Sequence, residues 1–93
     1  TMAELSFLTE ADVQQALAAH IRRLRKQAKL SRQALAERST VPAATIKKFE
    51  LTGQISLRQL LLLWECLDDL RRIQHLTREQ AQAPKTIAEV LAR

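Results

Sequence analysis

Apolar residues recur at steps of three and four along residues 10–29, the spacing of one face of an α-helix. The predicted buried stripe consists of Val13, Leu17, Ile21, Leu24 and Ala28. Thr9, followed three residues later by Asp12, is typical of a capping box and predicts a helix from about Glu10 to Lys29. Four basic residues lie largely off this stripe: Arg22, Arg25, Lys26 and Lys29. His20 borders the stripe, and we interpret it as a boundary residue.

Residues 31–53 predict two short helices joined by a tight turn. Ser31 is a favourable N-cap for the first helix, which should end near Arg38. Pro42 suits the first turn of the second, which should continue to Glu50 or Leu51 and end before Gly53. Five small or apolar positions would hold the two helices across each other: Leu35, Ala36, Val41, Ile46 and Phe49. The outer face of the second helix would then carry Ala43, Ala44, Thr45, Lys47 and Lys48.

The C-terminal half predicts two more helices with a surplus of leucine. Ser56 and Gln59 form a second capping box, and Asp68 and Asp69 begin the following helix. The first of these helices places Leu57, Leu60, Leu61 and Trp64 on one face, and the second carries Leu70, Ile73 and Leu76. A dimer interface and simple burial in the core are both open explanations of this surplus. The candidate interface residues are Leu62, Leu63, Ile73 and Leu76, with Ile87, Val90 and Leu91 further on.

These patterns divide the chain into a lead-in (1–8), a helix-turn-helix domain (9–76), and a linker with a C-terminal tail helix (77–93). Thr86 and Glu89 form a third capping box, which opens the tail helix beyond Pro84. A helix that short is marginal alone, so it must pack on its own domain or on a partner.

Composition and charge narrow the class of protein. The 93 residues are 46% hydrophobic with one glycine, two prolines and no tyrosine, which favours one all-α domain. The net charge of +5 is uneven, because residues 20–58 carry +8 and the remainder −3. This distribution indicates that the basic part of the chain binds a polyanion. The alternative is that it forms a basic face that is only solvated.

Catalytic chemistry has no support in the sequence. There is no glycine-rich phosphate loop, no His/Cys set at metal spacing and no nucleophile motif, so we expect no catalytic residue, metal or cofactor. Asp68 and Asp69 are adjacent on a helix and diverge. Cys66 is the only cysteine, which excludes an intramolecular disulfide, and we expect a buried thiol there. With no apolar run of about 18 residues, we expect a cytoplasmic protein without a membrane partner.

The outer face of the second short helix suits the DNA major groove. Ala43 and Ala44 keep the helix slim and can touch thymine methyl groups, while Lys47 and Lys48 can reach phosphates or guanines. The N-terminus of the first short helix and backbone N–H groups of the loop 52–54 can face phosphates. The full set of predicted contacts is Arg32, Gln33, Pro42, Ala43, Ala44, Thr45, Lys47, Lys48, Thr52 and Gln54. Nonspecific nucleic-acid binding is a weaker alternative, because aromatic stacking platforms are missing.

The run LRKQAKLSRQALAERSTVPAATIKKFE resembles the helix-turn-helix of lambda-repressor-like, Xre-type regulators, and the resemblance covers residues 17–76. It rests on Leu35, Ala36, Val41, Ile46 and Glu50. It implies a five-helix domain that binds double-stranded DNA as a homodimer on an inverted repeat, with residues 42–50 as the recognition helix. The position match implies that Ala43, Ala44, Thr45 and Lys48 face bases, and that Arg32, Gln33 and residues 52–54 face phosphates.

The next stretch, KFELTGQISLRQLLLLWECLDDL, is similar to the short Xre regulators encoded beside HipA-type kinase toxins, the HipB-like antitoxins. This similarity implies an autorepressor that also binds a HipA-like kinase toxin. The alternative function is a protein-interaction adaptor that binds and neutralises a partner through its C-terminal helices.

Two positions depart from the Xre pattern. The family often has Gln at the position of Arg32, where it buttresses the recognition helix and touches phosphate. It often has Gly at the position of Thr40, a β-branched residue that is poorly suited to positive φ. Either the turn is shaped differently here or strain is stored in it.

Overall fold

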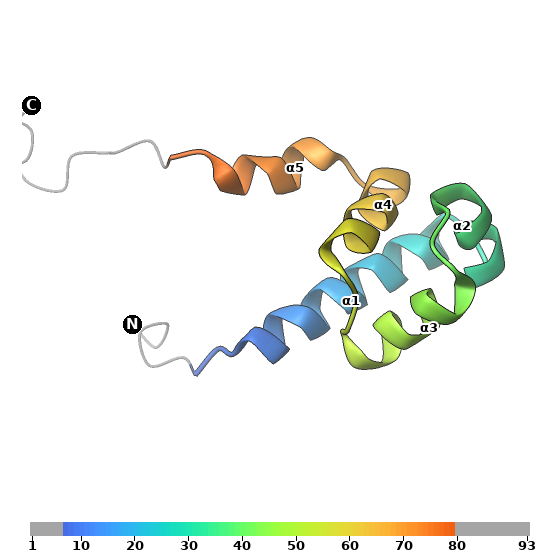
Figure 1. The fold of residues 1–93 in the computed structure, drawn as a ribbon, viewed down its shortest axis with the longest axis horizontal. Coiled ribbons are helices and arrows are strands. Elements are labelled where there is room, and N and C mark those ends of the chain that lie inside the picture. Colours follow the sequence, from blue (N-terminus) through green and yellow to red (C-terminus); the bar gives the residue numbers. More distant parts are fainter. Residues whose placement is uncertain (1–6, 80–93) are drawn as a thin grey trace, which may run out of the picture.

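The computed structural model of the chain describes residues 7–79. This part contains five α-helices, one 3-10 turn and no strand, so the predicted all-α five-helix domain is confirmed. The elements are α1 (Glu10–Gln27), α2 (Arg32–Ser39), α3 (Ala43–Thr52), α4 (Leu57–Leu67), α5 (Leu70–Gln74) and η1 (His75–Thr77) (Figure 1). The predicted tail helix, with Ile87, Val90 and Leu91, lies outside the described residues, as does most of the lead-in.

Polar caps begin the helices close to the predicted positions. The Thr9 hydroxyl accepts the Asp12 N–H at 3.1 Å, and the Asp12 carboxylate accepts the Thr9 N–H at 3.0 Å, closing the first predicted box. At α2 the Ser31 hydroxyl accepts the Ala34 N–H at 3.0 Å. At α4 only half of the predicted box forms. The Ser56 hydroxyl accepts the Gln59 N–H, as in a capping box. The Gln59 side-chain oxygen, however, accepts a hydrogen bond from the Ser56 hydroxyl and not from the Ser56 backbone N–H.

Residues with positive φ follow the first three helices: Lys29 (57°), Thr40 (66°) and Gly53 (79°). Gly53 is the predicted C-cap of α3. α1 ends two residues before the predicted Lys29, because Lys29 turns left-handed. The N–H of Leu30 then bonds to the carbonyl of Arg25 at 3.0 Å, which satisfies the end of the helix.

The core lies where α1 and α2 each pack against both α3 and α4. Its buried apolar residues are Ala18, Ile21, Leu35, Val41, Ile46, Phe49, Leu60, Leu63 and Trp64. Every helix from α1 to α4 therefore contributes at least one buried side chain to a single cluster.

The buried face of α1 differs from the predicted stripe. Its buried residues are Ala18, Ile21 and Arg25, whereas Leu17 and Leu24 are half-buried and Val13 and Ala28 are exposed. The first turn of α1 projects beyond α3 and α4 (Figure 1), and Val13 is 43% exposed. Arg25 was expected off the stripe, and its burial has an electrostatic cause that is described below.

Two expectations for α4 are wrong. Leu63 was a candidate interface residue, but its side chain is 0% exposed at the centre of the core. Leu57 was placed on the buried face, but it is 69% exposed. Leu62 is half-buried and packs against the core, so it offers less surface to a partner than predicted.

α5 begins where predicted, because the Asp69 side chain accepts the Arg71 N–H at 2.9 Å. The helix packs on α4 and extends away from the other helices (Figure 1). Of the predicted interface residues on it, Ile73 is half-buried against the core, and Leu76 in η1 is 79% exposed.

Cys66, expected to be buried, lies exposed on α4. Partial desolvation and the nearby Glu65 carboxylate raise the pKa of its thiol. Among residues 7–79, no helix is both long and apolar enough to cross a membrane.

Candidate nucleic-acid interface

α2 and α3 cross each other through buried side chains, as predicted. Leu35, Val41, Ile46 and Phe49 are each at most 1% exposed. Because these residues direct one side of α3 into the core, the opposite side of the helix faces solvent.

The turn between α2 and α3 keeps the left-handed conformation at Thr40, with φ 66° and ψ 8°. The turn therefore keeps the shape that glycine favours, and strain is stored at Thr40. A residue with a Cβ in this conformation costs about 1–2 kcal/mol. Ser39, which the sequence analysis did not single out, is 3% exposed, and its hydroxyl accepts the Val41 N–H at 3.1 Å.

The outer face of α3 and the loop after it carry most of the predicted DNA contacts. Seven of the ten are exposed, namely Gln33, Pro42, Ala44, Lys47, Lys48, Thr52 and Gln54, and the others, Arg32, Ala43 and Thr45, are partly buried. An open depression of about 490 Å3 is lined by Ala44, Thr45, Lys48 and Gln54 together with Ile55, Ser56 and Gln59. Ser56 and Gln59 had been considered only as a helix cap. Their polar side chains extend the candidate face onto the start of α4.

The charge on this face is positive only. Lys47 and Lys48 are exposed, and the single acidic residue of α3, Glu50, has a side chain that is 0% exposed. Turning Glu50 inward removes the one negative charge that would oppose a phosphate backbone.

Glu50 is held between two arginines on other helices. Arg25 from α1 donates from Nε to Oε2 at 2.7 Å and from Nη2 to Oε1 at 3.0 Å. Arg32 from α2 donates from Nε to Oε1 at 3.0 Å. Arg25 also donates from Nη1 to the carbonyl of Leu30 at 2.9 Å. The C-terminal part of α3 is thus fastened to both neighbouring helices by charge-assisted hydrogen bonds.

Burial of Glu50 raises the pKa of its carboxyl, but the hydrogen bonds from Arg25 and Arg32 outweigh this effect. The pKa of Glu50 therefore lies below its usual value, and the carboxylate is charged at neutral pH. Arg25, only 7% exposed, is the matching buried cation. This pair explains why a basic residue occupies a buried position of α1.

Arg32, predicted to bind phosphate, also buttresses α3. Its Nε is engaged by Glu50, and its side chain remains 31% exposed. Its two terminal nitrogens have no hydrogen-bond partner among residues 7–79, so they are available to an anion. The backbone N–H groups of Arg32 and Gln33, in the first turn of α2, are likewise without an acceptor in this part of the chain.

The loop after α3 departs from the prediction. Its backbone N–H groups were expected to face phosphates, but the Gly53 N–H bonds to the Phe49 carbonyl at 2.7 Å. The Gln54 N–H bonds to the Thr52 hydroxyl at 3.1 Å. These donors close the end of α3 and are not free for a ligand, so the loop presents side chains instead.

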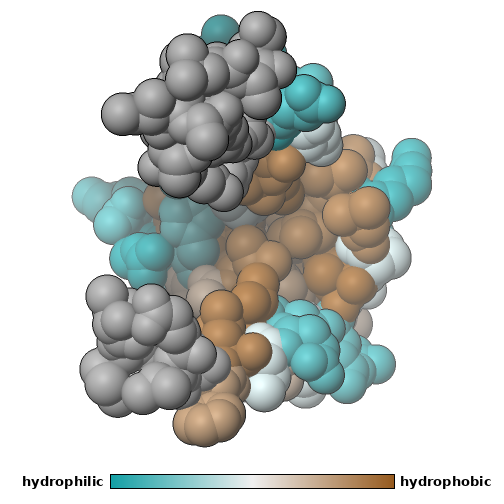
Figure 2. Space-filling view, turned by 90° about the vertical axis from the view of Figure 1, so that its left-hand side faces the viewer, coloured by the Kyte–Doolittle hydropathy of each residue, from teal (hydrophilic) through white to brown (hydrophobic). Residues whose placement is uncertain are grey.

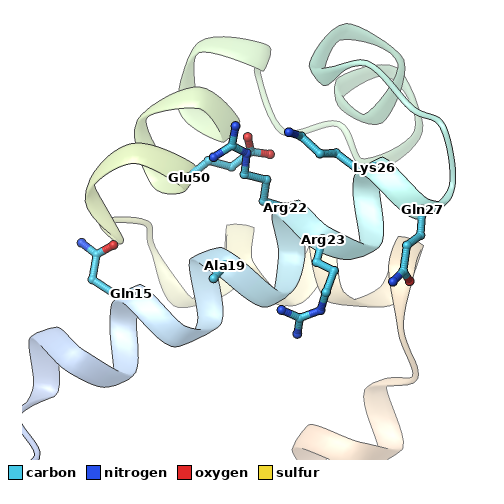
Figure 3. Close-up of a pocket in the computed structure, with 7 residues that line it drawn as sticks. All are labelled: Gln15, Ala19, Arg22, Arg23, Lys26, Gln27 and Glu50. Atoms are coloured by element: carbon cyan, nitrogen blue, oxygen red, sulfur yellow. The ribbon is translucent and has the colours of Figure 1, made fainter.

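A second basic surface lies on α1. An open hollow of about 480 Å3 is lined by Gln15, Ala19, Arg22, Arg23, Lys26, Gln27 and Glu50 (Figure 3). In Figure 3, Arg22 and Lys26 extend toward the Glu50 side of α1. Arg23 and Gln27 extend away from it. The net charge of +8 in residues 20–58 predicted a basic surface here. The sequence did not show which side of α1 the arginine and lysine side chains occupy.

His20 and Asp68 form a polar contact that the sequence analysis missed. The His20 Nε2 lies 2.9 Å from the Asp68 Oδ2, and the imidazole ring lies 5.2 Å from the Trp64 ring centre. Arg72 donates to the same carboxylate at 2.6 Å. The hydrogen bonds from His20, from the Asp69 backbone and from Arg72 lower the pKa of Asp68 to about 2. Among the described residues, no cluster of His, Cys, Asp and Glu could hold a metal ion.

The described part of the chain is thus an all-α five-helix domain whose second and third helices enclose a tight turn and expose one face. No protein-family model, no curated protein and no solved structure matches this chain.

Proposed function

We propose that this protein is a sequence-specific, double-stranded DNA-binding transcriptional regulator of the lambda-repressor-like, Xre type. In this proposal α3 enters the major groove, and the protein acts as an autorepressor in the cytoplasm. It binds an inverted repeat as a homodimer, as the resemblance of residues 17–76 implies.

The outer face of α3 is the observation that supports this function most. It combines a small residue, Ala44, with exposed Lys48 and partly buried Thr45, while Glu50 is turned into the core. A slim helix with donors and no exposed acid can approach base edges closely. Lys47, on the same helix, is available to the phosphates beside the groove.

The contacts behind this face support the proposal, because they hold α3 at several points. α3 is fixed by Phe49 and Ile46 in the core and by the two arginines on Glu50. A recognition helix needs this kind of support, because side chains must meet base edges within hydrogen-bonding distance.

An alternative function, a protein-interaction adaptor, is favoured by one observation. Leu76 is 79% exposed at the outer end of the fold, next to the half-buried Ile73. Such a position fits a protein partner, for which the HipB-like similarity suggests a HipA-like kinase toxin. The two roles are compatible, since the outer face of α3 is formed by different residues. A Leu76→Asp variant that lost kinase binding and kept DNA binding would support the adaptor role.

The decisive experiment is a titration of the protein against DNA from upstream of its own gene and against a scrambled control, at several salt concentrations. We expect the upstream DNA to bind at least 10³-fold more tightly at physiological salt, as specific regulators do. Equal affinities for both DNAs, with the same salt dependence, would refute sequence-specific recognition. A footprint of two half-sites about 34 Å apart would support a dimer.

A further inference from the structure

An apolar groove lies between α4 and the segment formed by α5 and η1. In Figure 1, α5 extends from α4 in the direction away from α2 and α3. The groove has a volume of about 390 Å3 and is lined by Leu57, Leu61, Leu70, Ile73, Gln74 and Thr77. Hydrophobic residues gather over the middle of the face shown in Figure 2. Leu57, at 69% exposed, is one of the largest apolar surfaces among residues 7–79. An open groove of this composition is a surface for another apolar segment.

We propose that the C-terminal segment of the chain itself, residues 86–93, forms a helix that docks into this groove. Ile87, Val90 and Leu91 recur at helical spacing and would form its apolar face, beginning at the Thr86–Glu89 capping box. This inference does not depend on the proposed DNA-binding function, because the residues that line the groove are different from those of the candidate DNA-binding face.

The segment that connects η1 to the tail is long enough for this contact. Residues 78–85, which connect Thr77 to the tail, reach up to roughly 27 Å when extended, enough to turn back along the groove.

The tail and the groove would stabilise each other. A short amphipathic helix is marginal in water by itself and is stabilised by packing on an apolar surface. The groove has leucine side chains that no residue in the range 7–79 covers. Joining the two through a short linker gives an effective concentration on the order of millimolar, which favours the chain's own tail over that of a second copy at micromolar concentration.

Disulfide trapping tests the docking directly. In the 93-residue chain with Cys66→Ser, Leu57→Cys and Leu91→Cys are introduced together and the protein is oxidised at low micromolar concentration. We expect a monomeric, fast-migrating species on a non-reducing denaturing gel, since a disulfide requires Cα atoms about 4.4–6.8 Å apart. The matched control pairs Leu91→Cys with Leu51→Cys, another exposed leucine, on α3. This control should remain reduced.

Two outcomes of the trapping would overturn the proposal. A covalent dimer as the main product would assign the groove to a second copy. Equal cross-linking of the Leu57 and Leu51 pairs, or of neither, would show that the tail has no preference for the groove.

A thermal unfolding cycle gives an independent readout, in which no cross-link is needed. Leu57→Ala changes a mostly exposed side chain, so without a docked tail its effect should be close to zero. With the tail docked, we expect it to lower Tm by about 4–8 °C. The shift should vanish when Val90→Asp has already displaced the tail, and persist in Ala92→Asp, which adds the same charge on the opposite side of the tail helix. An equal Leu57→Ala shift in both backgrounds would contradict docking.

Discussion

Arg25 and Glu50 form a two-point ion pair, at 2.7 and 3.0 Å, across the buried contact between α1 and α3. The Glu50 side chain is 0% exposed and that of Arg25 is 9% exposed. Burying two charges is costly, and only close geometry with further hydrogen bonds compensates for it. Here Arg32 and the carbonyl of Leu30 supply those further bonds. Such a pair adds little net stability compared with apolar residues of the same size, but the loss of one partner leaves the other charge buried and is costly.

Replacing Glu50 by Gln should destabilise the domain by about 3–5 kcal/mol, because Arg25 is left buried without its counter-charge. Urea unfolding followed by circular dichroism measures this loss. Glu37→Gln, which changes an exposed carboxylate on α2, is the control and should alter stability by less than about 0.5 kcal/mol. A similar small effect for both variants would mean that the buried pair is not important to the fold.

Replacing Arg32 by Ala should affect DNA binding more than stability. Arg25 continues to neutralise Glu50, so we expect a loss of only about 1 kcal/mol in the free energy of unfolding. If the free terminal nitrogens of Arg32 bind a phosphate, affinity should fall for all sequences alike. The slope of log K against log salt should become smaller by about 0.9. A changed preference among operator variants, without a change in slope, would instead assign Arg32 to α3 positioning alone.

Replacing Lys48 by Ala distinguishes a base contact from a phosphate contact. A base contact predicts relaxed specificity at one operator position, with a loss of about 1–3 kcal/mol. A phosphate contact predicts uniform weakening and a slope reduced by about 0.9. Arg78→Ala removes the same charge from a position beyond η1, far along the chain from α3, and should leave specificity unchanged. Full binding by a Lys47→Ala, Lys48→Ala double variant would exclude α3 as the recognition helix.

The Asp68 carboxylate should make stability fall in acid. Its pKa is lowered from 3.8 to about 2 in the folded protein by its bonds to His20, the Asp69 backbone and Arg72. A depressed folded pKa contributes stability that is present above about pH 4 and is lost as the pH falls toward 2. The difference in unfolding free energy between wild type and Asp68→Asn should therefore shrink over this interval. A difference that stays constant down to pH 2 would show that the carboxylate charge plays no part.

Replacing Thr40 by Gly should stabilise the domain. Glycine adopts φ 66° without the steric cost that threonine carries, and the gain should be about 0.5–1 kcal/mol after the greater flexibility of glycine in the unfolded chain is included. Thermal and urea unfolding measure it.

Gly53→Ala is the contrasting substitution and should destabilise. It places a Cβ at φ 79° and 3.1 Å from the Cβ of Gln14. If Thr40→Gly proved as destabilising as Gly53→Ala, the Thr40 hydroxyl bond to the Ser39 carbonyl would outweigh the relief of strain.

The sequence by itself determined the local structure: the helices, most of their caps, the turn between α2 and α3, and the side of α3 that faces outward. These features depend on residues within a few positions of one another. Thr9 and Asp12 meet because they are three residues apart, and Gly53 ends α3 because of its own backbone freedom. Periodicity then oriented Ile46 and Phe49 inward and Lys47 and Lys48 outward.

Only the tertiary structure decided which side chains the fold encloses and which contacts remain free. Arg25 looked like a surface residue because its charge is local information, whereas its partner Glu50 lies 25 positions away. Leu63 looked available to a partner, although it is 0% exposed within the core cluster. The same limit applied to His20 and Asp68, which are 48 positions apart. Burial and ion pairing depend on which helices meet in space, and a single sequence shows the faces of each helix but not their partners.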